Sequence, residues 1–305
     1  VGLLNLNASL TKAGVKYSSL WSESFDDPYF VKGLKRWLAT GRLGHDTSHV
    51  KTLAKVKIPT LAAQTGSKFG KEFRKSKAIM GIFDEGCMGM YNAIIPDDLL
   101  QAAGVFKERL SQSALYAAML EVSDSTARRH YQWLTKRGMR FAYGPDPAEH
   151  LTEAQVLEGL KMYDAAVQLA ARFGCAAIGI QYQQGLKDLC VASDLTEGLL
   201  NNPDRPPVYD GDGRELFAGL AVPHFNEVDE CAGLDALLTN RIWRDLGLDP
   251  STTLHDVRWG SDYSGNGVNE FVWVFEISGA VPPSHLVDGY AGATGERQPP
   301  MYFPR

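Results

Sequence analysis

The chain has 305 residues, of which 22% are charged and 44% hydrophobic, and its formal net charge is −5 at pH 7. This acidic balance argues against a general nucleic-acid binder, because neutralising phosphates requires a basic face. The sequence also lacks an apolar run of the roughly 18 uncharged residues that a membrane-spanning helix needs. The four cysteines have no C-x-x-C spacing, so we expect reduced thiols in a cytoplasmic protein; they are Cys87, Cys175, Cys190 and Cys231.

The first clear element is a helix that begins at Asp27-Pro28, because an Asp cap followed by Pro is a typical helix start. Residues 40–77 show no clear period. From residue 78 onward the pattern becomes regular. It predicts a strand over 78–83, a helix from Asp97 to Gly104, a strand over 105–110, and helices over 111–121 and 123–137.

The middle of the chain continues this alternation. Residues 152–155 form a capping box, which predicts a helix that ends near Gly174, and the small apolar residues over 175–181 predict a buried strand. Alternating strands and helices indicate an α/β fold with a doubly wound, Rossmann-like parallel sheet. A Pro- and Gly-rich stretch at 205–222 predicts a domain boundary. The helix expected over 229–246 and the two strands after it predict the start of a β-rich domain.

The loop after the strand at 78–83 contains Gly86-Cys87-Met88-Gly89. It is neither a Walker A motif, because no G-K-[ST] follows, nor a dinucleotide fingerprint, because the first G-x-G is missing. Loops at the carboxyl ends of parallel strands form the ligand crevice, and glycines there let the backbone approach a ligand. We interpret the loop as a pocket floor. A tight turn with Met88 and Met90 as core residues is the alternative.

Gln181 and Gln183 lie two residues apart where the strand over 175–181 should end. In an extended chain this spacing places both side chains on one face. Each amide both donates and accepts hydrogen bonds, which suits a polyol ligand. The alternative is two glutamines that face solvent.

Three carboxylates follow on two separate segments, Glu197 on the first and Glu227 and Asp229 on the second. Converging on one crevice, they could bind a hard divalent cation such as Mn²⁺ or Mg²⁺, or act as a general acid/base pair. Asp229 precedes a predicted helix and could instead be its N-cap. His224, His255 and His285 are all candidates for a third metal ligand, and their spacing does not choose between them.

Four stretches, in their order along the chain, resemble the L-fucose isomerase/L-arabinose isomerase superfamily. "GCMGMYNA" is similar to the family's Cys–Met–Gly–Met loop, and "GIQYQQGLKD" to its Q-x-Q strand end. "LTEGLLNN" resembles the segment with the metal-binding glutamate, and "NEVD" the E-x-D with the metal-binding aspartate. "VRWG" and "FVWVFEISGA" are similar to features near the family's domain junction. The resemblance covers roughly residues 70–285.

This resemblance implies an aldose–ketose isomerase that uses Mn²⁺ or a similar ion and forms a homo-oligomer. It implies that Glu197 and Asp229 are metal ligands and acid/base residues, that Gln181 and Gln183 lie near the sugar, and that the loop with Cys87 and Met88 floors its pocket. Cys87 is then a small buried residue and not a nucleophile. The alternative is a sugar-binding or regulatory relative without the chemistry.

The resemblance also implies a division of the chain. Residues 1–74 would be the last part of a first α/β domain, 75–215 a central α/β domain, and 216–305 a helix with an incomplete β-rich domain. Family members are longer, and they take a third ligand, a histidine, from near the end of their C-terminal domain. His285 has no assured match to that histidine, so the third ligand stays open.

Overall fold

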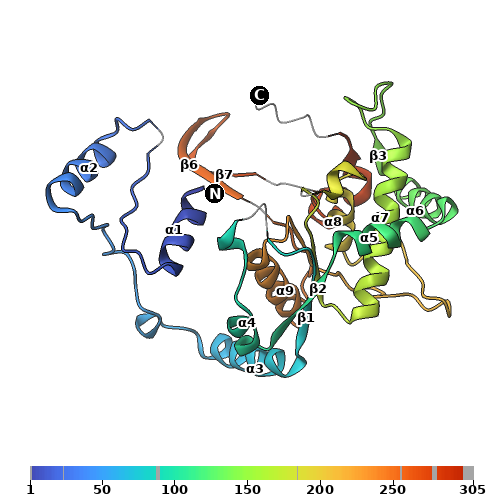
Figure 1. Ribbon diagram of the computed structural model, residues 1–305, viewed down its shortest axis with the longest axis horizontal. Coiled ribbons are helices and arrows are strands. Elements are labelled where there is room, and N and C mark those ends of the chain that lie inside the picture. The colour runs from blue at the N-terminus through green and yellow to red at the C-terminus, as the bar shows by residue number, and fades with distance from the viewer. Residues whose placement is uncertain are drawn as a thin grey trace. The chain divides into compact units, whose positions relative to one another are not determined.

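The computed structural model describes residues 2–22, 24–86, 90–183, 185–254, 256–276 and 280–297 (Figure 1). Its internal contacts divide the chain into two compact units. Unit 1 comprises residues 1–72 and 90–92, and unit 2 comprises residues 73–89 and 93–305.

Unit 1 contains the helices α1 (Gly2–Lys12) and α2 (Pro28–Thr40) and most of α3 (Thr60–Ser76). Helix α2 begins as predicted, because the Asp27 side chain accepts a hydrogen bond from the Phe30 N–H, and it ends at Gly41 in the left-handed conformation. The sequence did not predict α1 or α3. Two glycines inside α3, at positions 66 and 70, lower its helix propensity and obscure the pattern.

Unit 2 is built on a parallel sheet, which confirms the predicted α/β class. Within the described residues, its four strands lie in the order β2-β1-β4-β5, and each neighbouring pair is parallel. The strands are β1 (Ala78–Phe83), β2 (Val105–Leu110), β4 (Ala177–Ile180) and β5 (His224–Asn226). The first three lie within the predicted ranges, whereas the three residues of β5 are too few to show a period.

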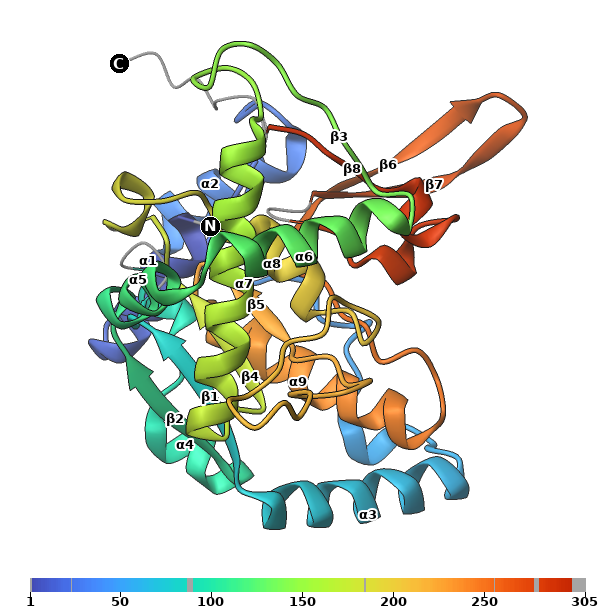
Figure 2. The ribbon, with the colours of Figure 1, turned by 90° about the vertical axis from the view of Figure 1, so that its right-hand side faces the viewer.

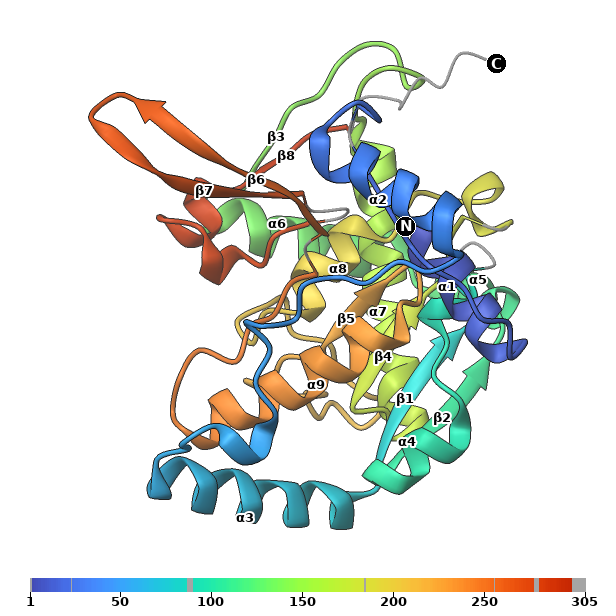
Figure 3. The same cartoon turned by 90° about the vertical axis from the view of Figure 1, so that its left-hand side faces the viewer.

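Helices cover both faces of this sheet. Helix α7 (Glu153–Phe173) lies over one face and packs against α5 (Gln112–Glu121), α6 (Asp124–Lys136) and α8 (Asp194–Leu200) (Figure 2). Helices α4 (Asp97–Ala103) and α9 (Glu230–Asp245) lie over the other face (Figure 3). Helix α7 starts at the predicted capping box, in which Thr152 and Gln155 bond to each other's backbone N–H. Its buried residues form much of the hydrophobic core.

A close contact between Phe225 and two glycines sets the spacing on the α9 face. A methyl group added at Gly179 would lie 2.3 Å from the Phe225 ring, and one added at Gly233 of α9 would lie 2.5 Å from it. The ring of β5 therefore fills the space that side chains on β4 and α9 would otherwise need. Neighbours of Phe225 in β5, His224 and Asn226, face the opposite side, where α8 lies.

Two smaller pairs complete the described strands. Strands β6 (Asp256–Gly265) and β7 (Val268–Glu276) form an antiparallel hairpin, as the sequence predicts for this segment, and β3 (Arg140–Phe141) pairs with β8 (Thr294–Gly295). Among the described residues, no helix combines the length and the apolar character needed to cross a membrane.

Candidate functional site

The strand order places a reversal between β1 and β4, and we use the word crevice for the space outside the carboxyl ends of these two strands. From β1 the chain crosses to β2 on one side, and the next strand of the sheet, β4, lies on the other side of β1. In open α/β sheets, ligands bind at such a reversal, outside the carboxyl ends of the strands. The loops that follow β1 and β4 are the ones that carry the predicted glycines and glutamines.

Gln181 joins these two loops. It is fully buried, its Nε2 donates to the carbonyl oxygen of Gly86 over 2.8 Å, and its Oε1 accepts from the backbone N–H of Gln183 over 2.9 Å. Each end of the amide thus makes a hydrogen bond within the protein, so Gln181 holds Gly86 of the loop after β1 against the end of β4. The predicted residues Cys87 and Met88 lie outside the described residues.

Gln183 reaches a carboxylate across the crevice. Its Nε2 donates to Oε1 of Glu227, and its own Oε1 is buried without a hydrogen-bond partner among the described residues. Glu227 and the following Val228 both have left-handed backbones, with φ of 55° and 59°. This conformation is costly for non-glycine residues, above all for a β-branched valine, and it often marks a functional turn.

Glu197 is the carboxylate most isolated from solvent and from partners. Helix α8 runs antiparallel to β5: Ser193 bonds to the Asn226 side chain, and one turn beyond Glu197 the Asn201 side chain bonds to the backbone of His224. Glu197 lies between these contacts, fully buried, and neither of its oxygens has a hydrogen-bond partner among the residues that the structure describes.

This environment changes the acidity of Glu197. Burial raises its pKa well above the ordinary value, and the nearby carboxylates of Asp194 and Glu227 raise it further. Burial, with a contribution from Glu227, also raises the pKa of Asp194. Three acidic side chains from α8 and the turn after β5 therefore influence one another, and a bound cation would relieve their repulsion.

His224 contributes a second buried group without partners. Only 2% of it is exposed, and neither ring nitrogen has a hydrogen-bond partner in the described part of the chain. Burial lowers the pKa of His224 to about 3, so the imidazole is neutral at physiological pH. The sequence singled out His224 only as one of three candidates. What distinguishes it, the packing of α8 over β5, is not visible in the sequence.

Asp229 is the N-cap of α9, which the sequence offered as the alternative to a metal ligand. Its Oδ1 accepts a hydrogen bond from the Ala232 N–H over 3.1 Å, which makes it the N-cap of α9. The carboxylates that raise the pKa of Glu197 are Asp194 and Glu227, and Asp229 is not among them. Among the described residues, no group of three or more His, Cys, Asp or Glu side chains is placed to hold a metal ion.

The carboxylates around Glu197 nevertheless match part of what a hard divalent cation needs as ligands. Glu197 has two oxygens without partners, and carboxylate oxygens are the ligands that Mn²⁺ and Mg²⁺ prefer. Asp194 and Glu227 provide further carboxylates close enough to affect it. Asp194 was not among the predicted residues, although its position three residues before Glu197 in a predicted helical segment places it one turn away.

A cluster of charges fixes the far end of the loop after β1. The Lys107 side chain is only 1% exposed, and its Nζ lies 2.7 Å from both Glu230 Oε2 and Glu85 Oε1. The same Glu230 oxygen accepts the N–H of Ile95 over 2.7 Å. Burial opposes the charge on Lys107, but the bonds to Glu230 and Glu85 prevail and raise its pKa. No sequence motif indicated this cluster.

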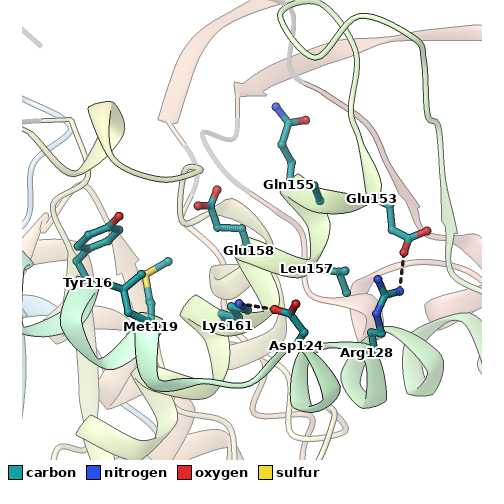
Figure 4. Close-up of a pocket in the computed structure, with 11 residues that line it drawn as sticks. Tyr116, Met119, Asp124, Arg128, Glu153, Gln155, Leu157, Glu158 and Lys161 are labelled. Carbon is teal, nitrogen blue, oxygen red and sulfur yellow. Dashed lines mark hydrogen bonds and ion pairs between the residues drawn. The ribbon is translucent and has the colours of Figure 1, made fainter.

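A separate pocket of about 600 Å³ lies between α5, α6 and α7 (Figure 4). Two ion pairs cross it, Asp124 with Lys161 at 2.6 Å and Arg128 with Glu153 at 2.8 Å. The charges in this pocket are largely neutralised by each other, and none of the predicted site residues lines it. It is therefore a weaker candidate than the crevice beside Glu197.

No protein-family model matches the chain, and no curated protein is similar enough to count as a match. The fold by itself defines the class: within the described residues, the chain is an α/β protein with a parallel four-stranded sheet and helices on both faces.

Proposed function

We propose that the chain is an aldose–ketose isomerase of the L-fucose/L-arabinose isomerase type, with a Rossmann-like domain and the start of a β-rich C-terminal domain. The observation that carries the proposal is Glu197, a fully buried carboxylate with raised pKa and two oxygens without partners in the described part of the chain. A group of this kind is suited to proton transfer near neutral pH.

In the proposed reaction, a proton moves between C1 and C2 of the sugar through an enediolate. Glu197 takes the proton from one carbon and returns it to the other, with Asp229 as the second acid/base residue. Gln183 orients the sugar hydroxyls, because its side-chain carbonyl can accept their hydrogen bonds while its Nε2 donates to Glu227. Gln181 holds the Gly86 carbonyl, and Cys87 and Met88, which follow it in the sequence, remain our proposed contacts to the sugar.

Glu197 and Asp229 would hold the divalent cation, Mn²⁺ or Mg²⁺, with Asp194 and Glu227 close by. When bound, the cation would supply positive charge that stabilises developing negative charge on the substrate. That positive charge would also lower the raised pKa of Glu197, so that the carboxylate becomes available as a base. The proposal includes a cytoplasmic homo-oligomer.

One observation favours a second function, a sugar-binding relative without catalysis. Asp229 already caps α9, and no three-residue metal group lies within the described residues. Such a protein would bind a sugar saturably, and EDTA would not abolish binding.

The test uses solvent exchange as its readout. The protein with Mn²⁺ is incubated in D₂O with a panel of pentoses and deoxyhexoses, and ketose formation is measured together with deuterium at C1 of the ketose and at C2 of the recovered aldose. We expect exchange with at least one sugar and its loss in Glu197→Gln, whereas Glu121→Gln, at an exposed position on α5, keeps it. Sugar binding without any exchange would favour the binding protein over the isomerase.

A further inference from the structure

A second pocket, of about 440 Å³, lies at the amino-terminal edge of the sheet. Residues just before β4, residues just before β5 and the second half of α9 form its walls. Because all four strands are parallel, this edge is opposite the one that carries the crevice with Gln181 and Glu227. The pocket is therefore distinct from the proposed sugar site.

The lining of this pocket combines positive charge with apolar surface. Three arginines contribute to it, Arg214 from the loop before β5 and Arg241 and Arg244 from the end of α9, together with a single acidic residue, Glu215. The apolar part comes mainly from the 216–222 segment and α9; it consists of Leu216, Phe217, Leu220, Ala221, Val222 and Leu237. A ligand that matches both parts is an anion with an apolar group.

Arg241 is held in place without an acidic partner. Its Nη1 donates to Ser76 Oγ over 2.7 Å, and its guanidinium carbon lies 5.2 Å from the centre of the Phe73 ring. Among the described residues it makes no ion pair, and the same holds for Arg244. A guanidinium has five N–H donors, so most of those on Arg241 stay available for a ligand.

The position of these arginines in the last turns of α9 suits the negative end of the helix dipole. That effect explains a cation at this place, but it does not explain why two arginines line one pocket together with apolar residues. Burial, and then the charge of Arg244, lower the pKa of Arg241 from its ordinary value, and the carboxylate of Asp245 offsets this only in part. An anion between the two would remove this repulsion, and a dianion would do so better than a monoanion.

We propose that this pocket binds an organic phosphate, with its phosphate group between Arg241 and Arg244 and its apolar part against Leu216 and Leu220. Arg214 is a weaker contributor, because its guanidinium already lies 3.0 Å from Asp210. The proposal does not depend on the isomerase, since it concerns the opposite edge of the sheet and is tested by binding alone.

The experiment compares four probes by isothermal titration calorimetry, namely phenyl phosphate, inorganic phosphate, benzoate and phenol. We expect phenyl phosphate to bind about tenfold tighter than any of the others, because it alone satisfies both parts of the pocket. Leu220→Ser should weaken phenyl phosphate while leaving inorganic phosphate unchanged. Equal affinities for phenyl phosphate and phenol would overturn the proposal, because they would show that the phosphate makes no contact.

Arginine variants locate the binding. Arg244→Gln changes an exposed residue, so the fold should be kept, and we expect phenyl phosphate to bind about tenfold more weakly, which is ~1.4 kcal/mol. The matched control is Arg172→Gln, in the last turn of α7 and 5.6 Å from the Phe173 ring but outside the lining. Equal loss of affinity in both variants would show a general charge effect and would also overturn the proposal.

Discussion

The Nζ atom of Lys107 lies 2.7 Å from Oε2 of Glu230, and both side chains are almost completely buried. This pair joins β2 to the first turn of α9, and the Glu230 oxygen also receives the N–H of Ile95 at the end of the loop after β1. One contact between residues far apart in the sequence thus fixes three segments around the crevice. Its stability consequences follow from the cost of leaving a buried charge unpaired.

Lys107→Met should lower the free energy of unfolding by about 3–5 kcal/mol, because the buried Glu230 would lose its positive partner, whereas Glu85 would keep Arg109. The double variant Lys107→Met/Glu230→Met should lose less than the sum of the single variants. Urea unfolding measures these values. Lys161→Met breaks the exposed pair with Asp124 and is the control, with an expected loss of at most about 1 kcal/mol. Additive losses in the double variant would contradict the coupling.

The buried side-chain amide of Gln181 joins the loop after β1 to the end of β4, so its removal should destabilise the protein. Gln181→Leu keeps most of the volume but leaves the Gly86 carbonyl without its donor, so we expect a loss of about 1–3 kcal/mol in urea unfolding. Gln101→Leu, at an exposed position on α4, should change stability by no more than about 0.5 kcal/mol. Similar small effects in both variants would refute the anchoring role.

Because burial raises the pKa of Glu197, we expect a variant without this charge to be more stable than the parent above about pH 4.5. Since its folded-state pKa is raised, stability falls as pH rises from the unfolded value, 4.5, through the folded value. Glu197→Gln cannot ionise, so its melting temperature should exceed that of the parent at about pH 8 and approach it near pH 4.5. Differential scanning calorimetry across this range measures both, and a variant that is less stable at every pH would contradict the assignment.

His224 should give the opposite pH dependence. Burial lowers its pKa to about 3 in the folded protein, against 6.5 for the free side chain, so stability is fully present above 6.5 and is lost as pH falls toward 3. His224→Gln removes this loss, and its melting temperature should depend less on pH over that interval. His150→Gln, an exposed histidine in the loop before α7, should keep the dependence of the parent.

A metal titration tests the proposed ligands by a readout other than activity. Mn²⁺ at about a hundredfold excess over its dissociation constant should stabilise the parent by about 2.7 kcal/mol. Glu197→Gln and Asp229→Asn should lose most of this effect. Asn caps a helix as well as Asp does, so Asp229→Asn separates a ligand from a cap. Asp235→Asn, exposed on α9, is the control, and an unchanged response in Asp229→Asn would leave Asp229 as a cap only.

Much of the fold follows from local sequence signals. Asp27 begins α2, the capping box at Thr152 begins α7, and Gly104 and Gly174 end their helices in the left-handed conformation, as their positions predict. These signals involve hydrogen bonds between residues that are close in the chain, so they can be recognised in the sequence without knowledge of the tertiary structure. The alternation of strands and helices along the chain also predicts the α/β class, because strands joined through helices pair in parallel.

The candidate site depends on contacts that no local pattern encodes. The packing of α8 on β5 buries Glu197 and His224, and the pairing of β1 with β4 brings Gln181 to Gly86, which lies 95 residues away. Two glutamines in sequence suggested a shared face, but only the tertiary structure decided that one anchors a loop while the other meets Glu227. Propensities and caps act over a few residues, whereas burial and charge coupling depend on which distant segments the folded chain places together.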